Sequence, residues 1–296
     1  MSVEITLAKV LAHCGGDPHQ AVHHLGRAIA AAPGDPAAYA AVAELLPALG
    51  TLPDNDAHVL PVLAYRHFLA GRMDEAVLAL GTLGGVSSRF SWADAPWFSD
   101  PAFLSQISTE ALSEAGHRLY DHGPGPDEAA LQPWLTATET LAARSSAGPE
   151  DLAKMAVLLR TFGKTSESLA LCDRADTLGR TVLAEVARAG TWRVLGDLDQ
   201  TAAAFQRALL LEPDNWSLHL DLSDLHATMG DPTAALASAE EGLRHAPDQP
   251  KLLTAHAAHH ARLTGKAGDL RKFDRVAADL DPAYADWLRE QATGTP

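Results

Sequence analysis

The chain has 296 residues, a formal net charge of −15 at neutral pH and a 47% share of hydrophobic residues, which is enough for a large buried core and excludes general disorder. The acidic balance argues against a nucleic-acid partner and against docking on an anionic membrane, because both need a basic face. No apolar run could span a bilayer and no secretory signal is evident, so we expect a cytoplasmic protein without nucleic-acid or membrane partners.

Helical periodicity with capping residues divides the N-terminal part of the chain into short helices. We expect a first array over residues 1–84. Its helices are predicted near residues 2–14, 17–32, 36–49, 57–70 and 73–84. An irregular connection follows over 85–107.

A second array is expected over residues 108–296. Its helices are predicted near residues 108–121, 126–144, 149–161, 165–178, 182–194, 198–211, 216–229, 232–246, 250–264 and 267–280. A last helix over 281–291 is expected to cap the array by covering its final apolar face. No segment shows the period of two that a strand needs, so the fold class is all-α.

One spacing recurs in both arrays: a glycine between two helices is followed 17 residues later by proline. Glycine tolerates the left-handed conformation that ends a helix, and proline cannot continue a helix interior. The spacing predicts pairs of antiparallel helices that repeat about every 34 residues. Four segments have this spacing, and the residues 5 and 12 positions after the glycine are mostly small. In order, the glycine, these two residues and the proline are Gly16, Ala21, Ala28 and Pro33; Gly196, Thr201, Ala208 and Pro213; Gly230, Ala235, Gly242 and Pro247; and Gly265, Leu270, Ala277 and Pro282.

Three segments carry a family resemblance: GDPHQAVHHLGRAIAAAPGDP at 16–36, GDLDQTAAAFQRALLLEPDN at 196–215 and GDPTAALASAEEGLRHAPDQ at 230–249. Each resembles the second helix of a tetratricopeptide (TPR) repeat, whereas the W-x2-L-G-x2-Y pattern of the first helix is intact in none. The resemblance covers most of 1–85 and 149–284 but identifies no subfamily. It implies a right-handed α-solenoid of antiparallel helical hairpins. A composition rich in Ala, Gly, Pro and Arg favours a bacterial, actinobacterial source.

The resemblance also implies a concave groove, lined by first helices, that binds a protein or peptide. Three residues before each turn glycine stand His13, Phe68, Arg160, Arg193, Ala227 and Arg262. The arginines and the histidine form a candidate row for anionic groups, although the helix dipole alone also favours cations in a last turn. Six residues before each glycine, the row is mostly small or apolar and unlike the carboxylate clamp of chaperone-binding members. The candidate groove contacts are Arg160, Arg193, Arg262, His13, Phe68, Tyr65 and Asp224.

The connection over 85–107 is rich in aromatic residues, and such a long connection is either functional or a structural element in its own right. Aromatic side chains favour burial, so a structural plug that closes the first array and docks it on the second is expected. The alternative is an insert that shapes a partner site. Its candidate contacts are Trp92, Trp97 and Phe98.

Signatures of catalysis and of cofactor binding are not evident. GKTSE at 163–167 lacks the upstream glycine and strand of a phosphate-binding loop. The pairs His19/His23 and His256/His260 each share a helix face, but further zinc ligands are not evident, which favours solvated or packed histidines. We expect no cofactor, no metal and no enzymatic activity.

The sequence therefore predicts a non-catalytic scaffold or adaptor that holds a peptide or partner protein, with anionic groups facing the arginine row. An alternative is an accessory or regulatory subunit of a biosynthetic or modifying enzyme, contacting it through 85–107 or the acidic outer surface. A metal or catalytic protein built on repeats is a third possibility, and it predicts stoichiometric metal.

Overall fold

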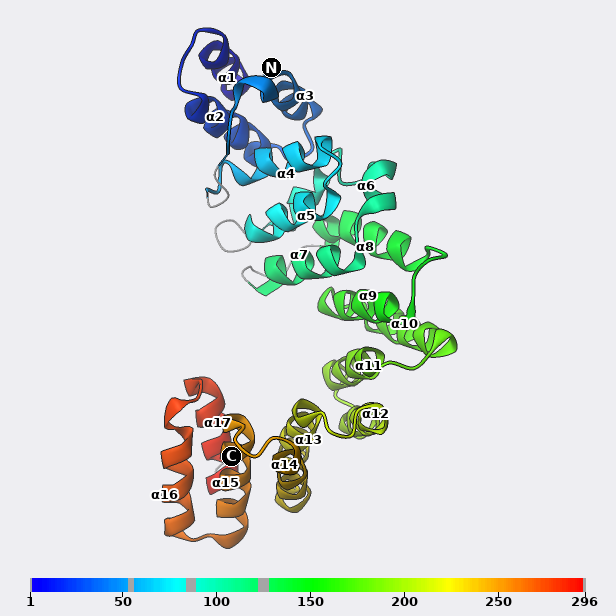
Figure 1. The fold of residues 1–296 in the computed structure, drawn as a ribbon, viewed down its shortest axis with the longest axis vertical. Helices are drawn as coiled ribbons and strands as arrows, with labels where there is room; N and C mark the ends of the chain where they lie inside the picture. The colour runs from blue at the N-terminus through cyan, green and yellow to red at the C-terminus, as the bar shows by residue number, and fades with distance from the viewer. Residues whose placement is uncertain (1, 53–55, 84–88, 122–127, 295–296) are drawn as a thin grey trace. The chain divides into compact units, whose positions relative to one another are not determined.

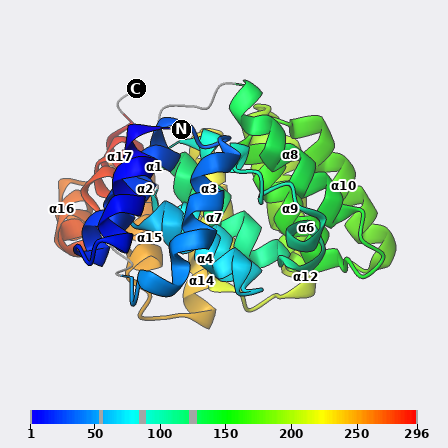
Figure 2. The same cartoon turned by 90° about the horizontal axis from the view of Figure 1, so that it is seen from above.

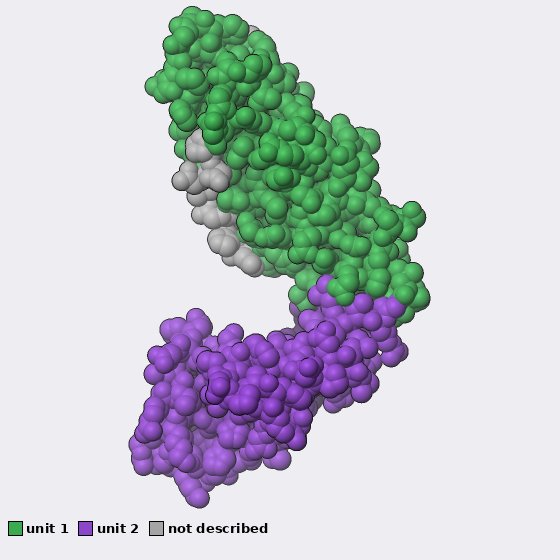
Figure 3. Space-filling view, in the orientation of Figure 1, with its two compact units in different colours: residues 1–178 green, residues 179–296 purple. Residues whose placement is uncertain are grey.

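The computed structural model describes residues 2–52, 56–83, 89–121 and 128–294. Within these ranges the secondary structure consists of seventeen α-helices and three short 3₁₀ helices, which confirms the all-α prediction. The described helices include none that is both long and apolar enough to cross a bilayer. The chain divides into two compact units, residues 1–178 (unit 1) and 179–296 (unit 2), coloured separately in Figure 3.

Unit 1 is built largely from antiparallel helical pairs (Figure 1). Seen from above in Figure 2, α9 and α10 lie against each other, as they do in the first view. Its helices are α1 (Val3–His13), α2 (Pro18–Ala31), α3 (Pro36–Leu45), η1 (Leu46–Ala48), α4 (Leu60–Leu69), α5 (Met73–Thr82), η3 (Phe90–Asp94), α6 (Pro101–Gln106), α7 (Thr109–Asp121), α8 (Glu128–Ala142), α9 (Pro149–Thr161) and α10 (Thr165–Leu178).

Unit 2 contains three successive pairs and a final helix. Its helices are α11 (Val182–Val194), α12 (Leu198–Leu211), α13 (Trp216–Thr228), α14 (Pro232–His245), α15 (Pro250–Thr264), α16 (Ala267–Val276), η4 (Ala277–Asp279) and α17 (Pro282–Thr293). The predicted capping helix is confirmed as α17, whose Leu288 is fully buried against Phe273 and Leu252.

The turns between paired helices contain the predicted glycines in the left-handed conformation. After α11, Gly196 has φ 78°, its N–H donates to the Arg193 carbonyl, and the next N–H donates to the Trp192 carbonyl. This pair of bonds satisfies carbonyls that the helix end leaves open. The same arrangement closes α4, α9 and α13.

The first hairpin departs from this frame by one residue. There the left-handed glycine is Gly15, with φ 71°, and the N–H of Gly16 donates to the Leu11 carbonyl. Gly16 therefore occupies the position that Arg72, Lys164, Asp197 or Asp231 occupies after the glycine of the other turns. Consequently Ala12, not His13, stands three residues before the left-handed glycine, as Arg193 does before Gly196. His13 was predicted at that position and lies one residue after it.

The aromatic segment of the expected 85–107 connection packs inside unit 1, and residues 84–88 lie outside the described residues. The segment contains the helices η3 and α6, which were not predicted. Its rings join a buried cluster: Phe98 lies 4.9 Å from Trp134, and Trp97 lies 5.6 Å from Phe68, between ring centroids. The Trp134 indole N–H donates to the Phe90 carbonyl at 3.1 Å. The predicted burial of these rings is confirmed.

Candidate functional site

The first-helix face of unit 2 brings charged residues of α13 against α17. The Tyr284 hydroxyl on α17 donates to the Asp224 carboxylate on α13, at 2.9 Å from Oδ1 and 3.0 Å from Oδ2. Asp224 stands six residues before its turn glycine, in a register that the family resemblance assigns to the groove. We therefore take the face of α11, α13 and α15 that α17 crosses as the candidate site.

Two cations and a second carboxylate surround Asp224. The Arg193 guanidinium lies 5.5 Å from the centre of the Phe205 ring, and the Lys251 ammonium lies 5.9 Å from the centre of the Tyr284 ring. Asp221 lies one helical turn before Asp224 on α13. Among the described residues, these four charged groups form no ion pair within 4 Å. Both signs of charge are thus available on one face.

Burial shapes the ionisation of this cluster. It raises the pKa of Asp224 to about 7, a shift that the Tyr284 hydrogen bond opposes and that Asp221 reinforces. Burial also raises the pKa of Asp221, against the attraction of Arg193 and Lys251. The pKa of Tyr284 is raised by burial and by the neighbouring carboxylates. Two half-buried acids that resist ionisation favour any occupant that brings positive charge or hydrogen-bond donors.

The Asp224 carboxyl should make the stability of unit 2 depend on pH. Because its folded pKa, about 7, exceeds an unfolded value near 4, it stabilises the fold at low pH. That contribution should be lost as pH rises from about 4 through about 7, and Asp224→Asn should remove this dependence, with a difference of at most about 4 kcal/mol. Urea unfolding followed by circular dichroism at pH 5 and 8 measures it.

Asp286→Asn, at an exposed position of α17, is the matched control and should leave the pH profile unchanged. A wild-type profile that coincides with that of Asp224→Asn would show that Asp224 ionises normally in the fold.

A first cavity of about 250 Å³ opens beside the N-terminal half of α17. Its walls combine the charged and aromatic groups just described with aliphatic side chains of α12 and α13. The lining residues are Arg193, Leu198, Asp224, Leu225, Thr228, Tyr284 and Trp287.

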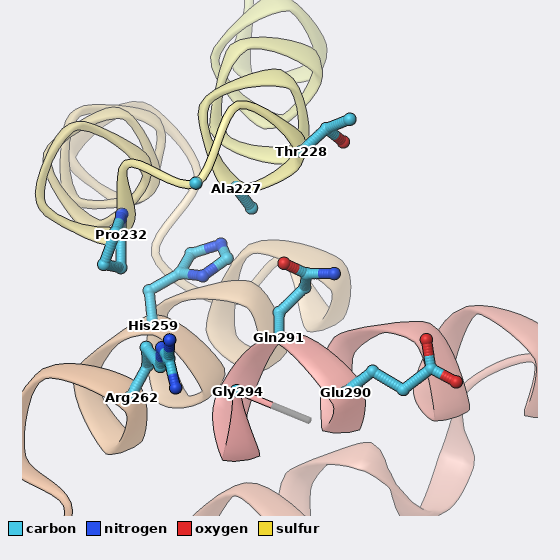
Figure 4. A pocket seen from close by; sticks show the side chains of 9 residues that line it. Ala227, Thr228, Pro232, His259, Arg262, Glu290, Gln291 and Gly294 are labelled. Carbon is cyan, nitrogen blue, oxygen red and sulfur yellow. The ribbon is translucent and has the colours of Figure 1, made fainter. Parts of the chain in front are cut away.

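A second cavity of about 300 Å³ lies beside the C-terminal half of α17 (Figure 4). It is bounded by the end of α13, the start of α14, and α15. Its lining residues are Ala227, Thr228, Gly230, Pro232, His259, Arg262, Glu290, Gln291 and Gly294. Arg193 and Arg262, predicted as members of one row, thus line separate cavities within unit 2.

The other predicted groove residues belong to unit 1. Tyr65 and Phe68 stack with ring centroids 5.8 Å apart on α4, and Tyr39 meets Tyr65 edge-on at 5.0 Å. Arg160 lies half-buried near the end of α9. His13 is exposed, and its Nδ1 contacts the Lys9 carbonyl at 2.7 Å. The predicted groove residues of unit 1 therefore include a pair of stacked aromatic rings and do not form a row of cations.

The three aromatic residues suggested as partner contacts in the connection are interior. Trp92, Trp97 and Phe98 are 2%, 3% and 1% exposed. Their rings pack within unit 1. These contacts agree with the burial expected of a structural plug and not with exposed partner contacts.

The histidine pairs lie among carboxylates and other rings. His23 is 3.2 Å from Asp56, and the rings of His256 and His260 stack at 6.1 Å. Across the part of the chain that the structure describes, three or more potential ligands nowhere gather closely enough to hold a metal ion.

Sequence reasoning missed several members of the site. Asp221 and Lys251 fall outside the two counted registers, and Tyr284, Trp287 and Gln291 belong to α17, which was treated only as a cap. The aromatic residues three apart on α17, whose rings stack at 5.7 Å, were the available signal.

Comparisons with known proteins concern the repeats and the fold. A sequence model described as tetratricopeptide repeat matches residues 195–258. Among solved structures, PilW, a widely conserved type IV pilus biogenesis factor, is 13% identical, with 78% of this chain and 97% of that chain covered and a TM-score of 0.51. At that identity the likeness concerns the fold alone.

Two further solved structures are similar. A tetratricopeptide repeat protein from Parabacteroides merdae is 16% identical over 98% of this chain and 97% of that chain, with a TM-score of 0.44. A thermophilic TPR protein from Thermus thermophilus is 21% identical over 68% and 96%, with a TM-score of 0.41. No curated protein sequence matches the chain significantly. The family model and the paired helices with their glycine turns identify residues 195–258 as tetratricopeptide repeats.

Proposed function

We propose that the chain is a non-catalytic interaction scaffold that holds a peptide segment of a partner protein on the α11–α13–α15 face of unit 2. TPR proteins typically mediate protein–protein interactions. The observation that carries the proposal is the pair of cavities on this face, each lined by charged side chains from first helices and by α17.

The charges on this face suit a segment with mixed polarity. Arg193 and Lys251 can donate hydrogen bonds to carboxylates, whereas Asp221 and Asp224 can accept them from amide or ammonium groups. Partly desolvated charges give orientation and specificity more than raw affinity. The partner predicted from the arginine row alone was anionic, and this face widens that prediction to a segment carrying both signs.

Selection of random twelve-residue peptides displayed on phage, against the full-length protein, tests the proposal. Peptides so obtained should bind the double variant Arg193→Ala/Lys251→Ala at least about tenfold more weakly than wild type, a loss of about 1.4 kcal/mol. Their affinity should also fall as salt is raised. Fluorescence anisotropy with labelled peptides measures both effects.

Arg244→Ala provides the control, because that side chain is 68% exposed on the second helix α14. It should change affinity less than about twofold. Equal affinities for wild type and the double variant would place the binding surface elsewhere. The alternative, an accessory or regulatory subunit that contacts an enzyme through 85–107 or through the acidic outer surface, stays a prediction. The aromatic side chains of 85–107 are buried in unit 1, which favours the outer surface as the contact.

A further inference from the structure

The cavity beside the C-terminal half of α17 contains a buried polar group without a partner. His259 is 1% exposed, and its Nε2 has no hydrogen-bond partner among the described residues. Figure 4 shows its ring reaching from α15 toward the end of α13, with Gln291 and Arg262 beside it. A buried polar atom left unpaired is costly, so the site gains from an occupant that completes its bonds.

Arg262 supplies the positive charge of this cavity. Among the described residues its guanidinium has no ion pair, and it packs against Gly294, where an added Cβ would lie 1.3 Å from Nη1. The left-handed C-cap glycine of α17, with φ 69°, thus leaves the space that the guanidinium fills. α17 therefore positions a cation at the mouth of the cavity as well as covering the core.

The charge of the lining selects the chemistry of the occupant. Burial and the nearby His256 lower the pKa of His259 to about 4, so its imidazole is neutral at physiological pH. Arg262 is then the cation, Gln291 offers an amide, and the Glu290 carboxylate points away in Figure 4. One planar cation matches one planar monoanion, whereas a phosphate dianion would leave excess negative charge.

We infer that this cavity binds a carboxylate of the partner segment, with Arg262 as the ionic contact and His259 and Gln291 as hydrogen-bond contacts. The inference rests on the proposed function. A volume of about 300 Å³ accommodates one side chain or one chain end. The carboxylate comes either from an Asp or Glu side chain or from the C-terminus of the segment, and the experiment separates these two sources.

Three pools of random hexapeptides are passed over immobilised full-length protein and quantified by mass spectrometry. The first has free C-termini and no Asp or Glu, the second has amidated C-termini with Asp and Glu, and the third is amidated and acid-free. Wild type should retain the first or the second pool at least about tenfold more than the third. Retention of the first pool indicates a chain terminus, and retention of the second indicates a side chain.

Arg262→Gln should abolish that preference, whereas Arg275→Gln, at an exposed position of α16, should preserve it. Equal retention of all three pools by wild type, or an unchanged preference in a folded Arg262→Gln protein, would overturn the inference and leave the scaffold proposal standing. Retention of no pool at all would count against both.

A second readout needs no substitution at Arg262. In ¹⁵N-histidine spectra of wild type, addition of a retained peptide should shift the imidazole nitrogens of His259, assigned with His259→Gln. His219 is the internal control, because its Nε2 already bonds the Pro213 carbonyl at 2.9 Å and should not move. A retained peptide that leaves the His259 signals unmoved would show that its carboxylate binds outside this cavity.

Discussion

Gly26→Ala is expected to destabilise unit 1 by at least about 3 kcal/mol, the upper range for overpacking a tight core. Gly26 lies in α2, where that helix meets the chain entering α4. A Cβ built on Gly26 would lie 1.6 Å from the His58 carbonyl oxygen and 2.6 Å from its carbon. The obstacle is backbone rather than the end of a flexible side chain, so a rotamer change cannot relieve it. The helices must separate and lose packing along their length.

Gly34→Ala is the matched control in the same unit. There the nearest atoms belong to Asp94 and lie 3.5 and 3.8 Å from the added Cβ, which is ordinary contact. Its effect should lie within about 1 kcal/mol of zero. Urea unfolding of the two variants beside wild type gives the comparison. If Gly26→Ala were as stable as Gly34→Ala, the close approach of α2 to the residues before α4 would be refuted.

Glu185→Gln is expected to destabilise unit 2 by about 3 kcal/mol, because it removes the charge from a buried ionic cluster. Glu185 is 1% exposed on α11. Its carboxylate accepts from Arg207 Nε at 3.0 and 3.1 Å and from Nη2 at 3.0 Å, and Arg188 Nε lies 3.5 Å away. Glutamine keeps the volume but removes the negative charge that faces the Arg207 guanidinium at 3.0 Å and the Arg188 guanidinium at 3.5 Å.

Glu240→Gln tests the opposite case, since that carboxylate is 58% exposed and 3.7 Å from a histidine. It should cost less than about 1 kcal/mol. The double variant Glu185→Gln/Arg207→Gln should lose less than the sum of its single variants, because the partners share one interaction. Strict additivity in thermal or urea unfolding would show that Arg207, which is 32% exposed, does not depend on Glu185.

The local elements of this fold were predictable because their determinants are local. The turn glycines, the N-capping aspartates and the prolines that interrupt helices each act within a few residues. Most helices lie where these residues predict them. The one error of register, at His13, arose from two consecutive glycines. Either could be counted as the turn, and only the backbone bonds show that Gly15 takes the left-handed position.

The candidate site was less accessible from sequence because it depends on distant pairings. Tyr284 and Asp224 are 60 residues apart and belong to helices that are not consecutive. The repeat spacing predicts a final helix but not that its aromatic side of Tyr284 and Trp287 lines a cavity on the first-helix face. Similarly, composition predicted burial of the aromatic connection but could not name Phe68 and Trp134 as its neighbours.

The placement of the six tryptophans gives the chain a built-in optical reporter. Trp92, Trp97 and Trp134 lie in the interior of unit 1, whereas Trp192, Trp216 and Trp287 of unit 2 are only half-buried. Indole emission moves to longer wavelength in water, so loss of unit 1 should produce the larger red shift. Emission spectra could therefore show which unit a given substitution or denaturant concentration has opened, without any label.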